Sequence, residues 1–351
     1  MRTGPAPTLK DVARAAGVSV MTVSNVVNGV PRVGTATRQR VLDAIDTLGY
    51  EVNLTARRLR AGRSGTLALV VPRIDHPYFA QLGAMLTDAL RPTGRHLVIE
   101  QTGASRQGEL TALSQARLQM YDGILLSVLG LGYDDVDALR THLPMVLLGE
   151  HAMPARFDHL MLGNVQGAHL ATAHLLARGA RRVALVGGRL DDDTGVSGLR
   201  TRGWREAHEA AGVPVDERLV LEAPHLETAQ GRHAVDAALR RGLDLDAVFA
   251  VTDQVAIGAL AALHDHGRTI PDDVQVAGFD ALALGEHVWP GLTTVDPHHE
   301  LLVEHALRLL DLRTSGDPAP PEHLEMPVRL VERGTTRRPA PDGPAPGRMA
   351  T

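Results

Sequence analysis

A short segment near the amino terminus carries residues that could bond to the edges of base pairs. Within residues 20–28, Val20 and Ser24 are four residues apart, as are Met21 and Asn25, so a helix would place all four side chains on one face. The Asn25 amide can donate to and accept from adenine, while Val20 and Met21 can contact a thymine methyl group. A helical hairpin with a solvated polar face would show the same pattern, so the segment alone leaves both interpretations open.

Two short helices are expected to position that face. Thr8 and Asp11 have the spacing of a capping box, which predicts a first helix that runs to about Ala16. Gly17 can end this helix with a positive φ, and Ser19 can cap the second helix. Two short helices joined by a glycine-containing turn form a helix-turn-helix.

A third helix is predicted over about residues 35–48, and it completes a small core. Its apolar stripe comprises Val41, Leu42, Ala44, Ile45 and Leu48. Val23, Val26 and Val27 of the second helix recur at three- and four-residue spacing and should pack against it. Arg38, near its start, can hold a phosphate. In this region the candidate DNA contacts are Thr8, Ser19, Val20, Met21, Thr22, Ser24, Asn25, Asn28 and Arg38.

The charge of the chain is divided unevenly. The first 64 residues carry ten basic and four acidic side chains, whereas the remainder carries 26 and 37. A cationic head on an anionic body is typical of a polyanion-binding module joined to a part that does not bind. The absence of cysteine excludes disulfides and thiolate metal sites. The sequence shows no secretory signal and no stretch long enough to span a membrane, so we expect a cytoplasmic, nucleoid-associated protein.

Residues 8–64 contain two long runs, TLKDVARAAGVSVMTVSNVVNG and TRQRVLDAIDTLGYEVNLTARRLRAGRS, and the first ends in a VSxxTVSxVxN core. These runs resemble the DNA-binding headpiece of the lactose-repressor (LacI/GalR) family over the whole segment. Two positions depart from the family pattern: Asn25 stands where many members have arginine, and Gly34 replaces a common serine cap. These departures concern the operator sequence rather than the class of function.

Residues 53–60 (NLTARRLR) follow the headpiece and are too few for a stable isolated helix. Repulsion among their three arginines predicts a segment that is disordered alone and helical once phosphates neutralise it, with Asn53 as its cap. The family resemblance implies that two such hinge helices, one per subunit, pair in a widened minor groove. Leu59 would then be the wedge between base pairs, with Ala56 beside it. An ordinary basic linker is the alternative.

From Thr66 onward, short apolar runs alternate with helical stretches. Strands are predicted at 66–72, 96–102, 122–128, 144–150, 182–188, 247–253 and 274–280. Helices are predicted near 79–90, 106–120, 165–178, 198–211 and 254–266. This alternation predicts a doubly wound α/β architecture, and the number of units indicates two lobes. The pattern resembles the type I periplasmic-binding-protein fold, which implies a ligand cleft between two discontinuous lobes joined by three crossings.

Ligand contacts in such a fold should lie at the carboxyl ends of strands. Tyr78 and Phe79 follow the first strand and could stack on a sugar or purine ring, or instead fill the core. The resemblance implies that Arg200 holds ligand oxygens and that Asp280 accepts hydroxyl donors. Asp253 ends a strand and begins a helix, so a helix cap is favoured over direct contact. These five residues form the candidate effector site.

At two positions near the expected cleft, the residue differs from the one common in the family. Ala281 stands where many members have a second acidic or amide residue, and Gly163 where aspartate is common. The acidic loop 191–193 could bind a cation, but a solvated loop is favoured. The sequence shows no phosphate-binding glycine loop, nucleophile elbow or metal-ligand spacing, so we expect neither an enzyme nor a cofactor or metal.

Together these patterns predict an N-terminal all-α helix-turn-helix headpiece fused to a two-lobed α/β effector domain. The expected boundaries are 1–52 for the headpiece, 53–65 for the hinge, 66–335 for effector binding and dimerisation, and 336–351 for a disordered tail. The expected function is transcriptional repression by a homodimer on a pseudo-palindromic operator, controlled by a sugar or glycoside, with a purine as the alternative. A transporter's solute-binding protein is disfavoured by the headpiece, and a carbohydrate enzyme by the missing catalytic residues.

Overall fold

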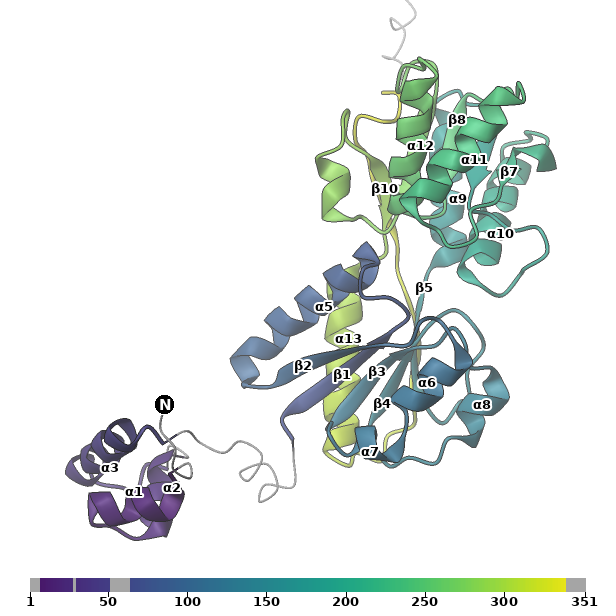
Figure 1. Ribbon diagram of the computed structural model, residues 1–351. Helices are drawn as coiled ribbons and strands as arrows, with labels where there is room; N and C mark the ends of the chain where they lie inside the picture. The colour runs from purple at the N-terminus through teal and green to yellow at the C-terminus, as the bar shows by residue number, and fades with distance from the viewer. Residues whose placement is uncertain (1–6, 28–29, 51–63, 339–351) are drawn as a thin grey trace, which may run out of the picture. The chain divides into compact units, whose positions relative to one another are not determined.

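The computed structural model describes residues 7–27, 30–50 and 64–338 (Figure 1). Contacts divide the chain into two compact units, Met1–Ser64 and Gly65–Thr351, which we call the headpiece and the body. Four predicted DNA contacts lie outside the described residues, and they are Asn28, Asn53, Ala56 and Leu59.

Three helices build the headpiece around a small valine-rich core. They are α1 (Leu9–Ala16), α2 (Val20–Val27) and α3 (Thr35–Leu48). Val12, Val23 and Val41, one from each helix, are fully buried and belong to one hydrophobic cluster. Burial of this face leaves the opposite side of α2 at the surface, so the predicted helix-turn-helix is confirmed in the described residues.

Local chemistry fixes both ends of α1. The Asp11 carboxylate accepts hydrogen bonds from the backbone N–H and the hydroxyl of Thr8, at 2.9 and 2.6 Å. Gly17 ends the helix with a φ of +63°, a conformation that costs glycine little. The prediction that Leu42 belongs to the buried face of α3 is wrong. Leu42 is 42% exposed, because the buried face contains Val41 and Ala44.

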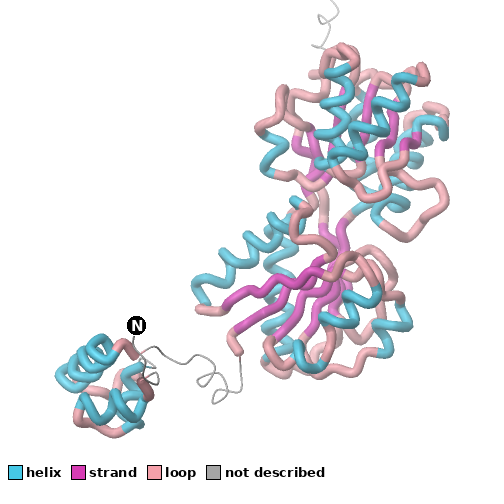
Figure 2. The backbone as a smooth tube through the Cα atoms, in the orientation of Figure 1, coloured by secondary structure: helices cyan, strands magenta, loops and turns pink. Residues whose placement is uncertain are grey.

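The body contains two six-stranded sheets, one in each lobe (Figures 1 and 2). The sheet of the N-terminal lobe is parallel throughout its described pairs, in the order β11 (His323–Met326), β5 (Asp158–Leu162), β4 (Met145–Leu148), β3 (Gly123–Ser127), β1 (Thr66–Val71) and β2 (His96–Gln101). The helices that cover it are α5 (Pro77–Leu90), α6 (Arg106–Ala112), α7 (Gln115–Leu118), α8 (Tyr133–Ala138) and α13 (His299–Thr314). Leu67 and Leu69 of β1 pack with α5 and α13, whereas Ala68 and Val70 pack with α6 and α8. Both faces of this sheet are therefore buried, as is usual for parallel strands.

The sheet of the C-terminal lobe has the order β12 (Arg329–Val331), β10 (Thr293–Asp296), β9 (Gln275–Phe279), β8 (Ala247–Ala250), β6 (Val183–Val186) and β7 (Val220–Leu221). Its helices are α9 (Asn164–Ala177), α10 (Val196–Ala210), α11 (Thr228–Arg240) and α12 (Asp253–Asp265). Trp204 of α10 is fully buried, and its Nε1–H donates to the Val183 carbonyl oxygen at 3.1 Å. This contact ties α10 to β6.

The chain passes between the lobes three times, from β5 to α9, from β10 to α13 and from β11 to β12. Each lobe is therefore discontinuous, and the predicted α/β architecture is confirmed. The sequence prediction missed elements without a long apolar run, among them β5, β10 and α11. The predicted helix over 106–120 is two helices, α6 and α7, with a break at residues 113–114.

The packed chain extends beyond the expected start of the tail at residue 336. Thr335 and Thr336 are buried, and the Thr335 hydroxyl donates to the Val276 carbonyl oxygen at 2.7 Å. The Arg337 backbone N–H donates to Gln275 Oε1 at 3.0 Å. The expected boundary at 335 is therefore too early, because these residues bond to β9. In the described part of the chain, no helix combines the length and the apolar character needed to cross a bilayer.

Candidate functional site

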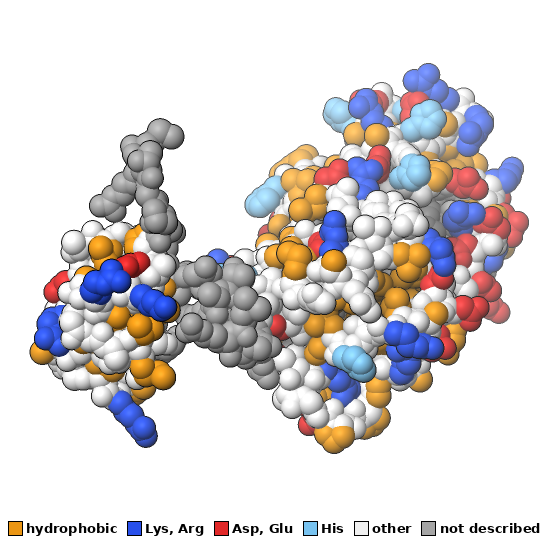
Figure 3. Space-filling model, turned by 60° about the horizontal axis from the view of Figure 1, so that its bottom comes forward, with side chains coloured by type: hydrophobic (Ala, Val, Ile, Leu, Met, Phe, Trp, Pro, Cys, Tyr) orange, Lys and Arg blue, Asp and Glu red, His pale blue; other side chains and the backbone are white. Residues whose placement is uncertain are grey.

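The outward face of α2 carries side chains that the sequence proposes for base contacts. Val23 and Val26 are buried in the headpiece core, whereas Met21 is 70% exposed and Val20 is 37% exposed. Asn25 is half-buried on the same side of the helix. In Figure 3 several Lys and Arg side chains and few acidic ones lie at the visible surface of the headpiece. A helix that presents both polar and apolar side chains on a positively charged domain is suited to bind in the major groove of DNA.

Hydrogen bonds fix the elements that flank this face. Ser19 Oγ accepts a hydrogen bond from the backbone N–H of Thr22 at 3.1 Å, so Ser19 caps α2 as predicted. Arg38 Nη2 donates to the Val30 carbonyl oxygen at 2.9 Å, which ties the start of α3 to the preceding loop. A guanidinium has five N–H donors, so this bond leaves others for a phosphate. The phosphate contact of Arg38, like the role of Ser24, stays a prediction.

In the body, Arg200 lies at the centre of a buried polar cluster. It projects from α10 and is 2% exposed. Its Nε donates to Asn164 Oδ1 at 2.7 Å, its Nη1 donates to the Val251 carbonyl oxygen, and Nη1 lies 3.5 Å from Asp280 Oδ1. The guanidinium carbon lies 3.5 Å from the ring centroid of Phe279, a cation–π contact. We call the surrounding set the interlobe cluster, and it comprises His76, Tyr78, Phe79, Glu150, Asn164, Arg200, Asp253, Phe279, Asp280 and His299.

Asp280 follows β9 and belongs to a strained stretch of backbone. Its φ is +116°, that of Ala281 is +47°, and that of His298, before α13, is +54°. Non-glycine residues rarely hold such values, and they concentrate at functional sites. Desolvation raises the pKa of the Asp280 carboxyl group, and the nearby Arg200 charge partly offsets this rise. The structure therefore brings together Arg200 and Asp280, which the sequence analysis singled out separately.

Asp253 has a role that the sequence analysis did not foresee. The cap of α12 is Thr252, whose hydroxyl accepts a backbone N–H of the first turn at 3.2 Å, so the expected cap at Asp253 is wrong. The buried Asp253 carboxyl group instead accepts from the Leu282 backbone N–H at 2.7 Å and from the Thr294 hydroxyl at 2.5 Å. A Cβ at Gly278 would lie 2.2 Å from Asp253 Oδ1, so glycine makes room for this carboxyl group. Desolvation, followed by the charge of a neighbouring carboxylate, raises the pKa of Asp253 well above its usual value.

Tyr78 and Phe79 lie in the first turn of α5, beside two histidines. The ring centroids of Tyr78 and Phe79 are 4.9 Å apart, and Tyr78 lies 5.4 Å from the ring of His299. The Phe79 ring lies 5.7 Å from that of His76. Both aromatic rings pack against the core of the N-terminal lobe while remaining half-buried. Core filling therefore accounts for part of each ring, and ligand stacking stays a prediction.

The sequence analysis missed Glu150 and Asn164, although the strand-end rule applies to both. Glu150 follows β4, and Asn164 begins α9 just after β5. Desolvation raises the pKa of Glu150 to about 7, even though the Arg200 charge and hydrogen bonds from Leu162 and Asn164 act to lower it. Two carboxyl groups, Glu150 and Asp280, therefore lie near a single buried guanidinium.

Packing explains the unusual residue at position 163. A Cβ at Gly163 would lie 2.9 Å from the Met326 carbonyl oxygen and 3.0 Å from a Val328 methyl group. An aspartate here would require the crossing from β11 to β12 to shift. Ala281 has no side-chain polar group, but its backbone N–H donates to Thr294 Oγ1 at 3.3 Å.

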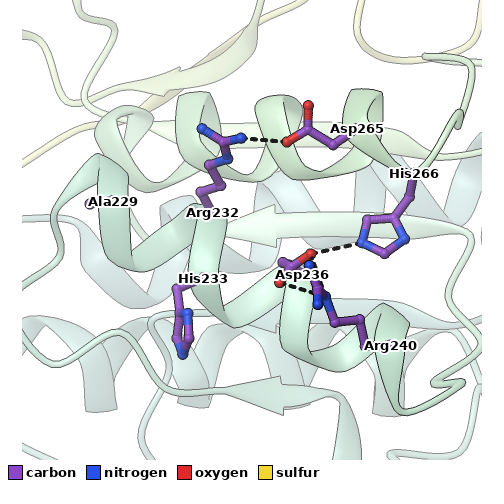
Figure 4. Close-up of a pocket in the computed structure, with 7 residues that line it drawn as sticks. All are labelled: Ala229, Arg232, His233, Asp236, Arg240, Asp265 and His266. Carbon is purple, nitrogen blue, oxygen red and sulfur yellow. Dashed lines mark hydrogen bonds and ion pairs between the residues drawn. The ribbon is translucent and has the colours of Figure 1, made fainter.

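A second polar group lies on the outside of the C-terminal lobe (Figure 4). Arg232 of α11 bonds to Asp265 at 2.6 Å, and His266 and Arg240 both bond to Asp236, at 2.9 and 3.0 Å. The hydrogen bond from His266 is the main reason that the pKa of Asp236 is lowered. Each charge has a partner within the group, and Asp265 lies at the end of α12 opposite to the interlobe cluster. This arrangement favours solvated ion pairs rather than an effector site.

A headpiece with an exposed recognition helix, joined to a two-lobed α/β body, defines the class of the protein as a DNA-binding transcription regulator. The family described as bacterial regulatory proteins, lacI family, matches residues 8–53, and the periplasmic binding protein-like domain matches residues 172–336. The ribose operon repressor of Halalkalibacterium halodurans is 33% identical over 333 residues, which cover 94% of this chain and 97% of that protein. The chain therefore belongs to the lacI family, and the predicted family membership is confirmed.

Solved structures of lacI-family proteins have the same fold over nearly the whole chain. The lac repressor dimer bound to operator and the anti-inducer ONPF has a TM-score of 0.77 at 26% identity, covering 95% of this chain and 99% of that one. The CelR–cellobiose complex has a TM-score of 0.68 at 33% identity, covering 94% and 99%. The predicted fold class is thus confirmed, while the individual DNA and effector contacts stay predictions.

Proposed function

We propose that the protein represses transcription as a homodimer on a pseudo-palindromic operator, with one headpiece on each half-site. The observation that carries this proposal is the α2 face, where Val20, Met21 and Asn25 lie opposite a buried valine core on a cationic headpiece. A two-fold dimer matches the symmetry of such an operator. The lac repressor, whose structure is a dimer bound to operator, supports this arrangement. Because the family consists of DNA-binding regulators, we propose that the protein acts by binding rather than catalysis, in the cytoplasm.

We further propose that a small metabolite at the interlobe cluster controls operator affinity. Arg200 and Asp280 supply hydrogen-bond donors and acceptors, and Tyr78 supplies a ring for stacking. Two relatives favour a carbohydrate, since one is named a ribose operon repressor and the other was solved with cellobiose. Coupling of about 1–3 kcal/mol between the two sites would change operator affinity about 5- to 150-fold. Residues 53–65 would carry this coupling as a hinge, through Leu59 in the minor groove.

Fluorescence anisotropy of the full chain on labelled duplexes tests the DNA-binding part of this proposal. Duplexes selected from a random palindromic library should bind at least about a thousandfold more tightly than scrambled duplexes at the same salt concentration. Asn25→Ala should reduce this ratio of affinities. Thr47→Ala, which changes an exposed side chain near the C-terminal end of α3, should leave the ratio unchanged. Equal affinity for palindromic and scrambled duplexes would refute the proposal.

A further inference from the structure

The first turn of α2 presents two apolar side chains to solvent. Val20 is 37% exposed and Met21 is 70% exposed, and both follow directly after Ser19, which caps the helix. The hydroxyl groups of Ser19 and Thr22 bond to each other at 2.9 Å, so the polar groups of this turn lie on either side of the two apolar residues. In a helix that enters the major groove, the first residues contact the base edges. Val20 and Met21 therefore lie where base recognition takes place.

The opposite face of α2 fixes the rotation of the helix. Val23 and Val26 are buried in the headpiece core, so α2 cannot turn about its axis without exposing them. Met21 and Asn25 are four residues apart and therefore share the face that points away from this core. Val20 lies at the edge of that face, which agrees with its smaller exposed fraction. The side chains that can reach bases from α2 are thus set by packing.

The sequence of α2 lacks the side chains that recognise G·C pairs most strongly. Its eight residues, VMTVSNVV, include no arginine, lysine, glutamine, glutamate or aspartate. Guanine is read mainly by bidentate arginine or lysine, and cytosine donates to carboxylates. The basic side chains of the described headpiece lie outside α2, where they are suited to phosphates, and they are Lys10, Arg14, Arg32, Arg38 and Arg40.

The side chains that α2 does carry match A·T pairs. An asparagine amide can donate to N7 and N6 positions as their geometry requires only at adenine, where it accepts from the N6 amino group and donates to N7. The C5-methyl group of thymine is the methyl group that the major groove presents. Contact between this methyl group and Val20 or Met21 removes apolar surface of both partners from water, which is favourable.

We propose that A·T base pairs specify the part of the operator half-site that α2 recognises. Val20 and Met21 contact thymine methyl groups, and the Asn25 amide bonds to the edge of an adenine. This inference rests on the proposed function, because it assigns the bases that the same helix face recognises. It makes the thymine methyl group itself a determinant of operator affinity.

Base analogues test the methyl contacts directly. The duplex selected from the random palindromic library is resynthesised with deoxyuridine, which lacks only the C5-methyl group, at one thymine position of both half-sites at a time. Fluorescence anisotropy of the full chain measures Kd for each duplex. Loss of one buried methyl group weakens binding about fourfold, so we expect at least one position at which substitution of both half-sites raises Kd about fifteenfold.

Protein variants assign this effect to α2. Met21→Ala and Val20→Ala should bind the unsubstituted duplex more weakly, and each should lose the difference between thymine and deoxyuridine at the position that its side chain contacts. Both residues are exposed, so the core of the headpiece stays intact. Met120→Ala, which truncates an exposed methionine of the body, is the matched control and should keep the full difference.

The contact of Asn25 is tested with 7-deazaadenine, which lacks the N7 acceptor. At one adenine position of the half-site this analogue should raise the Kd of the wild type, and Asn25→Ala should not distinguish it from adenine. A complete bidentate contact discriminates between bases about 5- to 150-fold, and loss of N7 should remove part of this preference.

Wild-type Kd values that are equal for thymine and deoxyuridine at every position would overturn the inference. So would a deoxyuridine effect that persists in both Met21→Ala and Val20→Ala, or a half-site in which Asn25→Ala changes the preference only at G·C pairs. The proposed function fails in a different way, through equal affinity for selected and scrambled duplexes. If the analogues have no effect while that ratio of affinities stays high, the inference fails and the proposed function stands.

Discussion

Replacing Arg200 with methionine should destabilise the body strongly, because it leaves a carboxylate buried without its counter-charge. Arg200 is 2% exposed and Asp280 is 3% exposed, and the variant also leaves Asn164 Oδ1 and the Val251 carbonyl oxygen without their donor. Removal of one partner of a buried ion pair costs about 3–5 kcal/mol. In a domain of this size, 1 kcal/mol lowers the melting temperature by about 2–4 °C, so we expect a drop of about 6–20 °C.

The matched control is Arg202→Met, two residues further along α10. Arg202 Nε lies 3.5 Å from Glu206 Oε1, but both side chains are about half exposed, so the ion pair is screened by water. Its loss should change the melting temperature by no more than about 2 °C. Differential scanning calorimetry of the full chain at pH 8 measures both variants. A melting temperature for Arg200→Met within about 2 °C of the control would refute the view that this buried pair stabilises the body.

The destabilisation should depend on pH. Burial already raises the pKa of Asp280, and Arg200 partly offsets this effect, so loss of Arg200 raises the pKa further. A carboxyl group with a raised pKa in the folded state holds a proton that the unfolded chain releases at a lower pH. Stability of the variant therefore falls as pH rises from about 4 through the new folded pKa. The difference from wild type should be smaller at pH 5 than at pH 8, and Arg200→Met combined with Asp280→Asn should recover part of it.

Three further changes test other parts of the structure. Glu109→Ala should lower the melting temperature by about 5–15 °C, because this fully buried carboxylate accepts the backbone N–H groups of residues 129, 130 and 131 at 3.0, 2.7 and 3.0 Å; an unchanged value in calorimetry would contradict this. Because the pKa of Glu150 is raised to about 7, the stability of the wild type should fall by about 1–3 kcal/mol as pH rises from about 4.5 through 7. Glu150→Gln should lack this fall, which chemical denaturation of both proteins at pH 5 and pH 8 would measure. The same pH dependence in both proteins would contradict this prediction. Leu59→Ala should weaken operator binding at least about tenfold in the anisotropy assay without changing effector affinity, and an unchanged operator Kd would exclude the wedge.

The parts of the fold that the sequence predicts well are those with a strong local pattern. The continuous apolar run at residues 66–71 is buried on both faces, and such runs identify β1 and most of the other central strands. Edge strands and connecting helices have weaker patterns: β11 has only one fully buried residue, Met326, so its pairing with β5 depends on the tertiary fold. The cap of α12 was assigned one residue too late because Thr252 and Asp253 are both good capping residues.

Site residues divide in the same way. Arg200 and Asp280 could be predicted because a resemblance to known proteins marks their positions, whereas their contact across 3.5 Å depends on how α10 and β9 pack. Glu150 ends an apolar run as many surface residues do, and only the fold places it near Arg200. The partner of His299 is a backbone oxygen 19 residues earlier, so no side-chain pattern in the sequence indicates it.

The segment from Asp280 to His299 explains how a ligand at the interlobe cluster could act on both lobes. It leaves β9, passes through β10 of the C-terminal lobe and ends at α13, which packs in the core of the N-terminal lobe. Asp280 faces Arg200 of α10 with its carboxylate and accepts the His299 N–H with its carbonyl oxygen, so a single residue bonds to both lobes. A ligand that changes these bonds must shift both contacts together. Because each lobe has a closely packed core, we expect the shift to appear as a rotation of one lobe against the other rather than as a local deformation.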